Sequence, residues 1–150
     1  MESKKRIGLL VLLLFALGLA GCSSAPEVPV GVTDQIMEIV RWNLNYASNE
    51  DLAGYMWTIH EDSPGYAQTQ SMMEVAIDDF DLDYQLVKSE LVSYSGDTAK
   101  VQVTQITRSK GSDPAFRDNQ LLAVHTLKLS GDGKWKIYSS NFSDVEYLEP

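Results

Sequence analysis

The sequence predicts an α+β domain in which three helices precede a four-stranded antiparallel sheet. Apolar residues recur at helical spacing in three segments between Thr33 and Phe80. After Asp81 the pattern changes to apolar strands separated by glycine-bearing turns. A length of 150 residues, with 44% apolar and 22% charged residues, suits one globular domain and leaves no room for two.

Each expected helix begins at polar residues that favour a helix N-terminus. The caps we expect are Thr33 or Asp34 for the first helix, the run Ser48–Asp51 for the second, and Ser63 followed by Pro64 for the third. The second helix is expected to run to about His60, and the third carries its apolar side as far as Phe80.

Four segments rich in valine, leucine, threonine and aromatic residues are expected to be strands. They are Leu82–Tyr94, Thr98–Thr107, Asn119–Leu129 and Lys134–Phe142. A tight turn over Ser95–Thr98 pairs Tyr94 with Ala99 and Val92 with Val101. This register places Glu90 opposite Val103 on the inner face, unless a bulge near Leu91 turns Glu90 outward.

The last hairpin can be aligned from its own pattern. A three-residue loop, Gly131-Asp132-Gly133, pairs apolar with apolar side chains, whereas a two-residue loop mixes the two faces. The expected inner pairs are Leu129 with Trp135, Leu127 with Ile137, His125 with Ser139, and Ala123 with Asn141. The reverse face then carries an uncovered apolar patch made of Leu122, Val124, Tyr138 and Phe142.

The first residues are expected to be an export signal. Lys4, Lys5 and Arg6 precede the apolar run Ile7–Ala20, which is short for a transmembrane helix, the alternative reading. The sequence Leu19-Ala20-Gly21-Cys22 resembles the lipobox of prokaryotic lipoproteins, and Cys22 is the only cysteine. This resemblance implies a signal peptide over 1–21, a lipidated Cys22 with a tether over 22–31, and a domain over 32–150 held outside the cytoplasm, in the cell envelope.

The charge of the chain limits its partners. The net charge of −9 becomes −11 without residues 1–21, because this segment contains three basic side chains and one acidic side chain. Such a body repels nucleic acid and anionic lipid headgroups, so we expect no nucleic-acid partner.

The order of elements and three stretches resemble the nuclear transport factor 2-like superfamily, whose fold is a cystatin-like cone. The resemblance covers Val32 to Leu148 and rests on SNEDLAGYMWTIHEDSPGY, DPAFRDNQLLAVHTLK and DGKWKIYSS. It implies a cavity at the wide end of the cone and a possible homodimer through the patch Leu122, Val124, Tyr138 and Phe142. It implies no activity, because the superfamily includes isomerases, dehydratases, cyclases and silent binding domains.

The expected pocket lies at the polar end of the inner sheet face. Its candidate residues are His125, Ser139, Asn141, Gln105, Trp42 and Tyr46. For catalysis, His125 or Glu90 could act as base and a helix tyrosine such as Tyr55 as acid. No inner-face aspartate matches that of ketosteroid isomerase-like members, so we carry over no catalytic set. No local spacing of histidines and carboxylates predicts a metal site, and no cofactor is expected.

Three functional hypotheses follow, of which the last is a purely structural envelope lipoprotein with neither pocket nor partner. The first is a membrane-anchored binding domain for a small, partly apolar ligand or an envelope protein. The second is an isomerase, dehydratase or cyclase type of enzyme with an acid-base pair in the cavity.

Overall fold

The computed structural model describes residues 27–111 and 113–149. The predicted signal peptide, Cys22 and the first part of the tether lie outside the described residues. Three helices are followed by four strands, as expected. The elements are α1 (Val32–Ser48), α2 (Leu52–Trp57), α3 (Tyr66–Asp79), β1 (Leu82–Tyr94), β2 (Thr98–Ser109), β3 (Asn119–Leu129) and β4 (Trp135–Tyr147). None of the described helices is long and apolar enough to cross a membrane.

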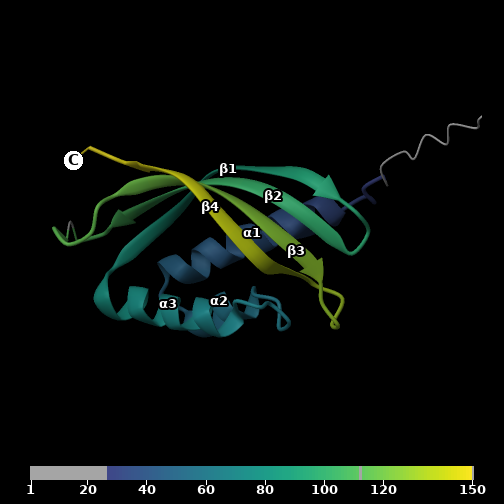
Figure 1. The fold of residues 1–150 in the computed structure, drawn as a ribbon, viewed down its shortest axis with the longest axis horizontal. Helices are drawn as coiled ribbons and strands as arrows, with labels where there is room; N and C mark the ends of the chain where they lie inside the picture. The colour runs from purple at the N-terminus through teal and green to yellow at the C-terminus, as the bar shows by residue number, and fades with distance from the viewer. Residues whose placement is uncertain (1–26, 112, 150) are drawn as a thin grey trace, which may run out of the picture.

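The four strands form one antiparallel sheet in the order β1-β2-β3-β4. Figure 1 shows the curved sheet with all three helices on one side of it, α1 against the sheet and α3 further out. Consecutive strands are neighbours, so short turns suffice to connect β1 to β2 and β3 to β4. The fold class predicted from the sequence is therefore confirmed.

A buried cluster joins α1 to the middle of the sheet. Its members are Ile36, Ile39, Val40, Met56, Ile59, Ala99, Val101, Val103, Leu127, Trp135 and Ile137. The α1 residues recur every three or four positions and the strand residues every second position, so each element presents one apolar side to the cluster. All these residues lie between positions 36 and 137, so a polypeptide of residues 27–150 contains this core.

The helix starts differ from those expected at two of the three sites. Gly31 precedes α1 in a left-handed conformation with φ of 82°, which suits glycine, and no side chain caps the helix. Thr33 and Asp34 lie inside the first turn. Gly65 precedes α3, while Ser63 accepts a hydrogen bond from the Gly65 backbone N–H, in the turn before the helix.

The start of α2 follows the prediction, but its end does not. The Asp51 carboxylate accepts a hydrogen bond of 2.8 Å from the backbone N–H of Gly54. The helix ends at Trp57 because the next residues pair with β4. The Ile137 N–H donates to the Thr58 carbonyl at 2.8 Å, and the His60 N–H donates to the Ile137 carbonyl at 2.9 Å.

Both hairpins match the prediction next to their turns and depart from it further away. In the first, Tyr94 faces Ala99 as expected, but a bulge at Val92 places Leu91 opposite Val101. Glu90 therefore faces Gln102, is exposed, and forms a salt bridge of 3.1 Å with Lys88. The inner-face placement of Glu90 is therefore wrong, and the alternative that a bulge near Leu91 turns Glu90 outward is confirmed.

In the last hairpin, Leu129 faces Trp135 and Leu127 faces Ile137, as predicted. A bulge at Tyr138 then shifts the register by one residue. His125 faces Ser140 instead of Ser139, and the following inner pair is Ala123 with Phe142. Because side chains alternate along a strand, this single extra residue moves Phe142 to the inner face and Asn141 to the outer face.

Candidate functional site

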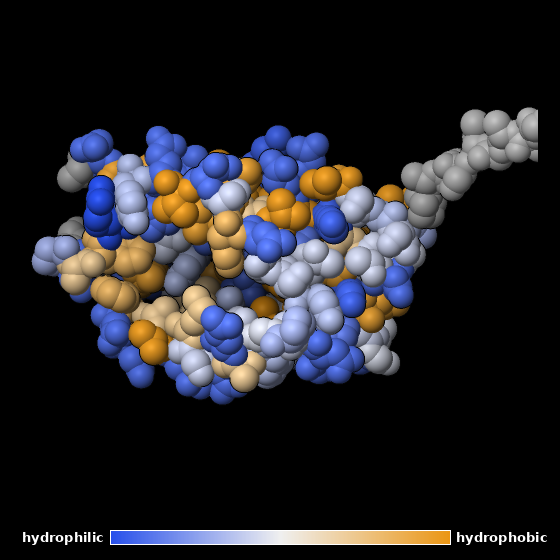
Figure 2. Space-filling view, in the orientation of Figure 1, coloured by the Kyte–Doolittle hydropathy of each residue, from blue (hydrophilic) through white to orange (hydrophobic). Residues whose placement is uncertain are grey.

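A cavity of about 760 Å³ lies between α3 and the inner face of the sheet. Figure 2 shows it as a hollow in the surface. All three helices and all four strands contribute residues to its wall. Cavities of this size hold ligands as large as typical drug molecules.

None of the described residues that form the wall carries a charged side chain. Its polar members carry amides, hydroxyls and one imidazole, and they alternate with apolar residues. They are Asn43, Tyr55, Ser63, Gln68, Thr69, Tyr84, Gln105, Thr107, Asn119, His125, Tyr138, Ser139 and Ser140. Among the described residues no group of three or more histidine, cysteine or acidic side chains is placed to hold a metal ion.

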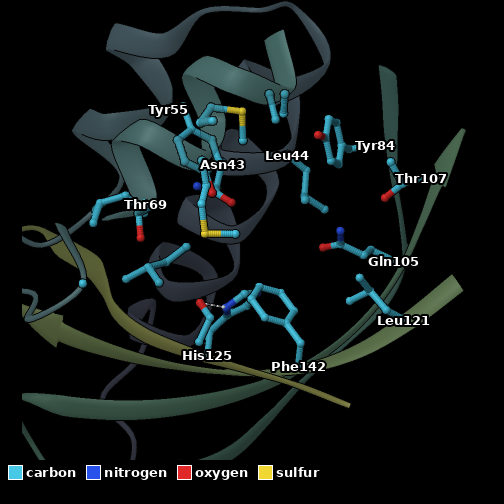
Figure 3. A pocket seen from close by; sticks show the side chains of 18 of the residues that line it. Asn43, Leu44, Tyr55, Thr69, Tyr84, Gln105, Thr107, Leu121, His125 and Phe142 are labelled. Atoms are coloured by element: carbon cyan, nitrogen blue, oxygen red, sulfur yellow. Dashed lines mark hydrogen bonds between the residues drawn. The ribbon is translucent and has the colours of Figure 1, made fainter. Parts of the chain in front are cut away.

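His125 points into the cavity from β3. Its Nδ1 lies 2.7 Å from the Oγ of Ser140, and Phe142 meets its ring edge-on at a centroid distance of 6.4 Å. Figure 3 shows His125 and Phe142 next to each other on the sheet side of the cavity. Burial lowers the pKa of His125 from 6.5 to about 4, because the cavity gives the charged imidazolium no compensating partner. The imidazole is therefore neutral at pH 7.

Three tyrosines line the wall, Tyr55, Tyr84 and Tyr138, and burial shifts the pKa of the first two. Tyr55 comes from α2 and Tyr84 from β1. Burial raises the pKa of Tyr84 to about 12, with a further contribution from Tyr55. The pKa of Tyr55 is also raised by burial, which outweighs the opposing hydrogen bond with Asn43. Both phenols are protonated at pH 7 and can donate hydrogen bonds.

Four of the residues expected at the pocket or in catalysis line the cavity. They are His125, Ser139, Gln105 and Tyr55. Ser139 does so although its register partner is Thr126, and it directly follows the bulge at Tyr138.

The other predicted pocket residues lie elsewhere. Asn141 pairs with Val124 on the outer face of the sheet. Trp42 is 38% exposed and packs against Trp57, with the ring centroids 5.6 Å apart. The Tyr46 ring lies so close to Gly54 that even a methyl group at Gly54 would collide with it. The Asn141 assignment is wrong because the bulge at Tyr138 exchanges the inner and outer faces of β4 beyond it. The Trp42 and Tyr46 assignments are wrong because Asn43 and Leu44 are the α1 residues that face the cavity.

The predicted dimer patch is divided between two faces. Leu122 and Val124 remain half-buried on the outer face, while Tyr138 and Phe142 line the cavity. Phe142 is 60% exposed and forms part of the cavity mouth together with Met72 and Val75 of α3, which are 64% and 57% exposed. The patch as it was predicted does not exist.

Sequence reasoning missed several wall residues. Tyr84 and Thr107 follow the inward alternation of β1 and β2 and could have been found from it. The contribution of α3, which includes Thr69, Met72 and Met73, could not have been found in this way. It depends on how the helix lies over the sheet, and no local pattern records that.

A family model, the C-terminal domain of anti-sigma-I factor RsgI9, matches residues 38–148. The matched segment starts inside α1 and continues past the end of β4, so it spans the whole sheet and most of the cavity wall. The chain belongs to this family. No curated protein matches this chain.

Solved structures show that this family member has the nuclear transport factor 2-like fold. One is a Nostoc punctiforme protein of unknown function with a cystatin-like fold, with a TM-score of 0.66 and 14% identity over 81% of this chain and 96% of that one. A nuclear transport factor 2-like protein from Shewanella oneidensis has a TM-score of 0.60 and 16% identity over 75% and 98% of the two chains. A ketosteroid isomerase-like protein from Erwinia carotovora has a TM-score of 0.57 and 18% identity over 78% and 96%. The cone fold that the resemblance implied is confirmed.

Proposed function

We propose that this chain is a lipid-anchored binding domain outside the cytoplasm, whose cone cavity holds a small ligand without transforming it. One observation carries the proposal. The cavity is large enough for a ligand, yet none of the described residues in its wall is a carboxylate, and its imidazole has a pKa of about 4. An efficient general base has a pKa near the working pH. His125 is too weak a base at pH 7, and Glu90 faces solvent on the sheet.

The family name supports a binding role. An anti-sigma-I factor is, by that name, a regulatory protein, and a regulator needs to bind a signal or a partner rather than to convert it. The anchor rests on the amino-acid sequence, in which a basic head and an apolar run end at Cys22.

For the binding role, we expect residues 27–150 purified under mild conditions to carry a small molecule that native mass spectrometry detects. Ala76→Trp, on the cavity side of α3, should abolish this adduct because the indole occupies the space. Ala67→Trp places the same side chain on the exposed side of α3 and serves as the matched control. Binding that survives in Ala76→Trp, or a wild-type protein that takes up nothing, would refute the cavity as a binding site.

For the anchor, we expect the full chain to incorporate an alkyne-tagged fatty acid when it is expressed in bacteria. Cys22→Ser should remove the label, because the thioether needs the cysteine sulfur. An external protease should digest the domain on intact spheroplasts. Label that is retained in Cys22→Ser, or complete protection from the protease, would contradict this part of the proposal.

The second candidate function is an enzyme of the isomerase or dehydratase type. The two protonated phenols of Tyr55 and Tyr84 favour it, because such groups can donate hydrogen bonds to an oxygen that gains negative charge during a reaction, and one of the similar structures is described as ketosteroid isomerase-like. A bound ligand whose NMR spectrum changes during incubation with the protein, but not with Tyr84→Phe, would establish the enzyme. An unchanged spectrum favours binding alone.

A further inference from the structure

Three buried side chains on the cavity wall have polar atoms without a partner in the described protein. Gln105 and Thr107 of β2 are 7% and 5% exposed, and their side chains bond to no other described residue. His125 is 5% exposed and bonds to Ser140 through one ring nitrogen, which leaves the second one free. No polar side-chain atom of the described residues is both sealed off and unpaired, so these atoms face the cavity.

Buried polar groups are nearly always hydrogen-bonded in folded proteins. Here the partner must come from whatever fills the cavity. Figure 3 shows Tyr84, Gln105 and Thr107 along one wall, with Asn43 and Tyr55 on the other side. Gln105 offers both a donor and an acceptor, and Thr107 and Tyr84 offer hydroxyl groups that can do either. This wall can therefore bond to an amide, a carbonyl or a hydroxyl group.

The described wall gives a charged ligand no oppositely charged side chain to pair with. None of the described residues that line it is an arginine, lysine, aspartate or glutamate, and at pH 7 the His125 imidazole and the Tyr84 phenol are neutral. Removing an unpaired ion from water is unfavourable by several kcal/mol, so a charged ligand would bind poorly here. The net charge of −9 opposes anions further.

The mouth of the cavity has the opposite character. Met72, Val75 and Phe142 are apolar and more than half exposed there, whereas Gln105 and Thr107 are buried. A ligand that suits both regions has a polar group directed toward β2 and an apolar body in contact with α3 and Phe142.

We propose that the cavity selects uncharged amphipathic molecules, with a ligand amide, carbonyl or hydroxyl bonded to Gln105 and Thr107. This inference rests on the proposed function, because it names the ligand class of the same cavity. Charge, and not only size, decides what enters.

The test uses four probes that share one ring system and differ in the polar group. They are 2-naphthamide, 2-naphthoate, 2-naphthylmethylammonium and naphthalene, and each competes with the uncharged dye Nile red for residues 27–150 at pH 7. We expect 2-naphthamide to displace the dye at concentrations at least about tenfold lower than either ion, because only the ions lose strong hydration without a partner.

Substitutions on β2 then test whether Gln105 and Thr107 bind the polar group of the ligand. Gln105→Leu and Thr107→Val should each weaken 2-naphthamide binding by about three- to tenfold, the effect of one hydrogen bond. Both should leave naphthalene binding equal or tighter. Gln102→Leu and Thr104→Val are matched controls on the outer face of the same strand and should change neither.

The possible outcomes separate the two proposals. If 2-naphthoate or the ammonium probe competes as well as 2-naphthamide, the ligand class is wrong while the cavity remains a binding site. If Gln105→Leu and Thr107→Val bind 2-naphthamide like the wild type, the assignment of these two residues as the hydrogen-bond partners of the ligand is wrong. If neither Nile red nor any probe binds, the proposed function fails together with this inference.

Discussion

Leu127→Ala is expected to lower the free energy of unfolding by about 3 kcal/mol, the cost of deleting a fully buried leucine side chain. Leu127 is 0% exposed and belongs to the cluster that joins α1 to the sheet. It faces Ala99 on β2 and Ile137 on β4, so the lost methyl groups leave a hole that three strands share. Urea unfolding of residues 27–150, followed by circular dichroism, measures the change.

The control for this substitution lies two residues along the same strand. Leu129 is 43% exposed, so Leu129→Ala should lower the free energy of unfolding by less than about 1 kcal/mol. The two variants lose the same atoms from the same strand and differ mainly in burial. Equal effects would show that Leu127 is not in the core that the structure assigns to it.

The second large effect is a loss of stability in mild acid that depends on His125. Its pKa is about 4 in the folded protein and 6.5 when unperturbed, so between these values the unfolded state binds a proton that the folded state does not. Stability therefore falls as the pH falls through this window. Between pH 7 and pH 4.5 the expected loss from this residue is about 2 to 3 kcal/mol.

His125→Gln should remove this contribution, because glutamine keeps a polar group near Ser140 and does not titrate. The comparison stays above pH 4.5, because Glu61 and Asp132 have lowered pKa values in the folded protein, and the stability that they contribute is lost mainly below this pH. The measurement is urea unfolding at several pH values. An unchanged loss of stability between pH 7 and pH 4.5 in His125→Gln would show that the histidine is not buried in neutral form.

The sequence predicted the parts of the fold that local patterns determine. Apolar alternation next to the loop at 131–133 was enough to pair Leu127 with Ile137, because a slip of one residue would bury lysines. Further along the strand the prediction failed at Tyr138. Tyrosine and serine suit either face of a sheet, so the pattern carried no signal for the bulge there.

The same limitation applies to the candidate site. His125 and Gln105 lie on strands whose inner faces can be recognised, and both line the cavity. Trp42 and Tyr46 were misplaced because the apolar stripe of a helix is broad, and adjacent positions differ by about 100° around its axis. Which neighbours turn inward depends on the packing of α1 against β1 and α2, and this is a property of the assembled fold.

The most direct test of the binding account is an NMR titration of ¹⁵N-labelled residues 27–150 with 2-naphthamide, observed at the side-chain amides of two glutamines on β2. Gln105 faces the cavity, and Gln102 faces outward three residues away. The account predicts that the Gln105 amide signals shift progressively with added 2-naphthamide, while those of Gln102 stay in place. Gln105 signals that do not move, or equal shifts at both glutamines, would contradict it.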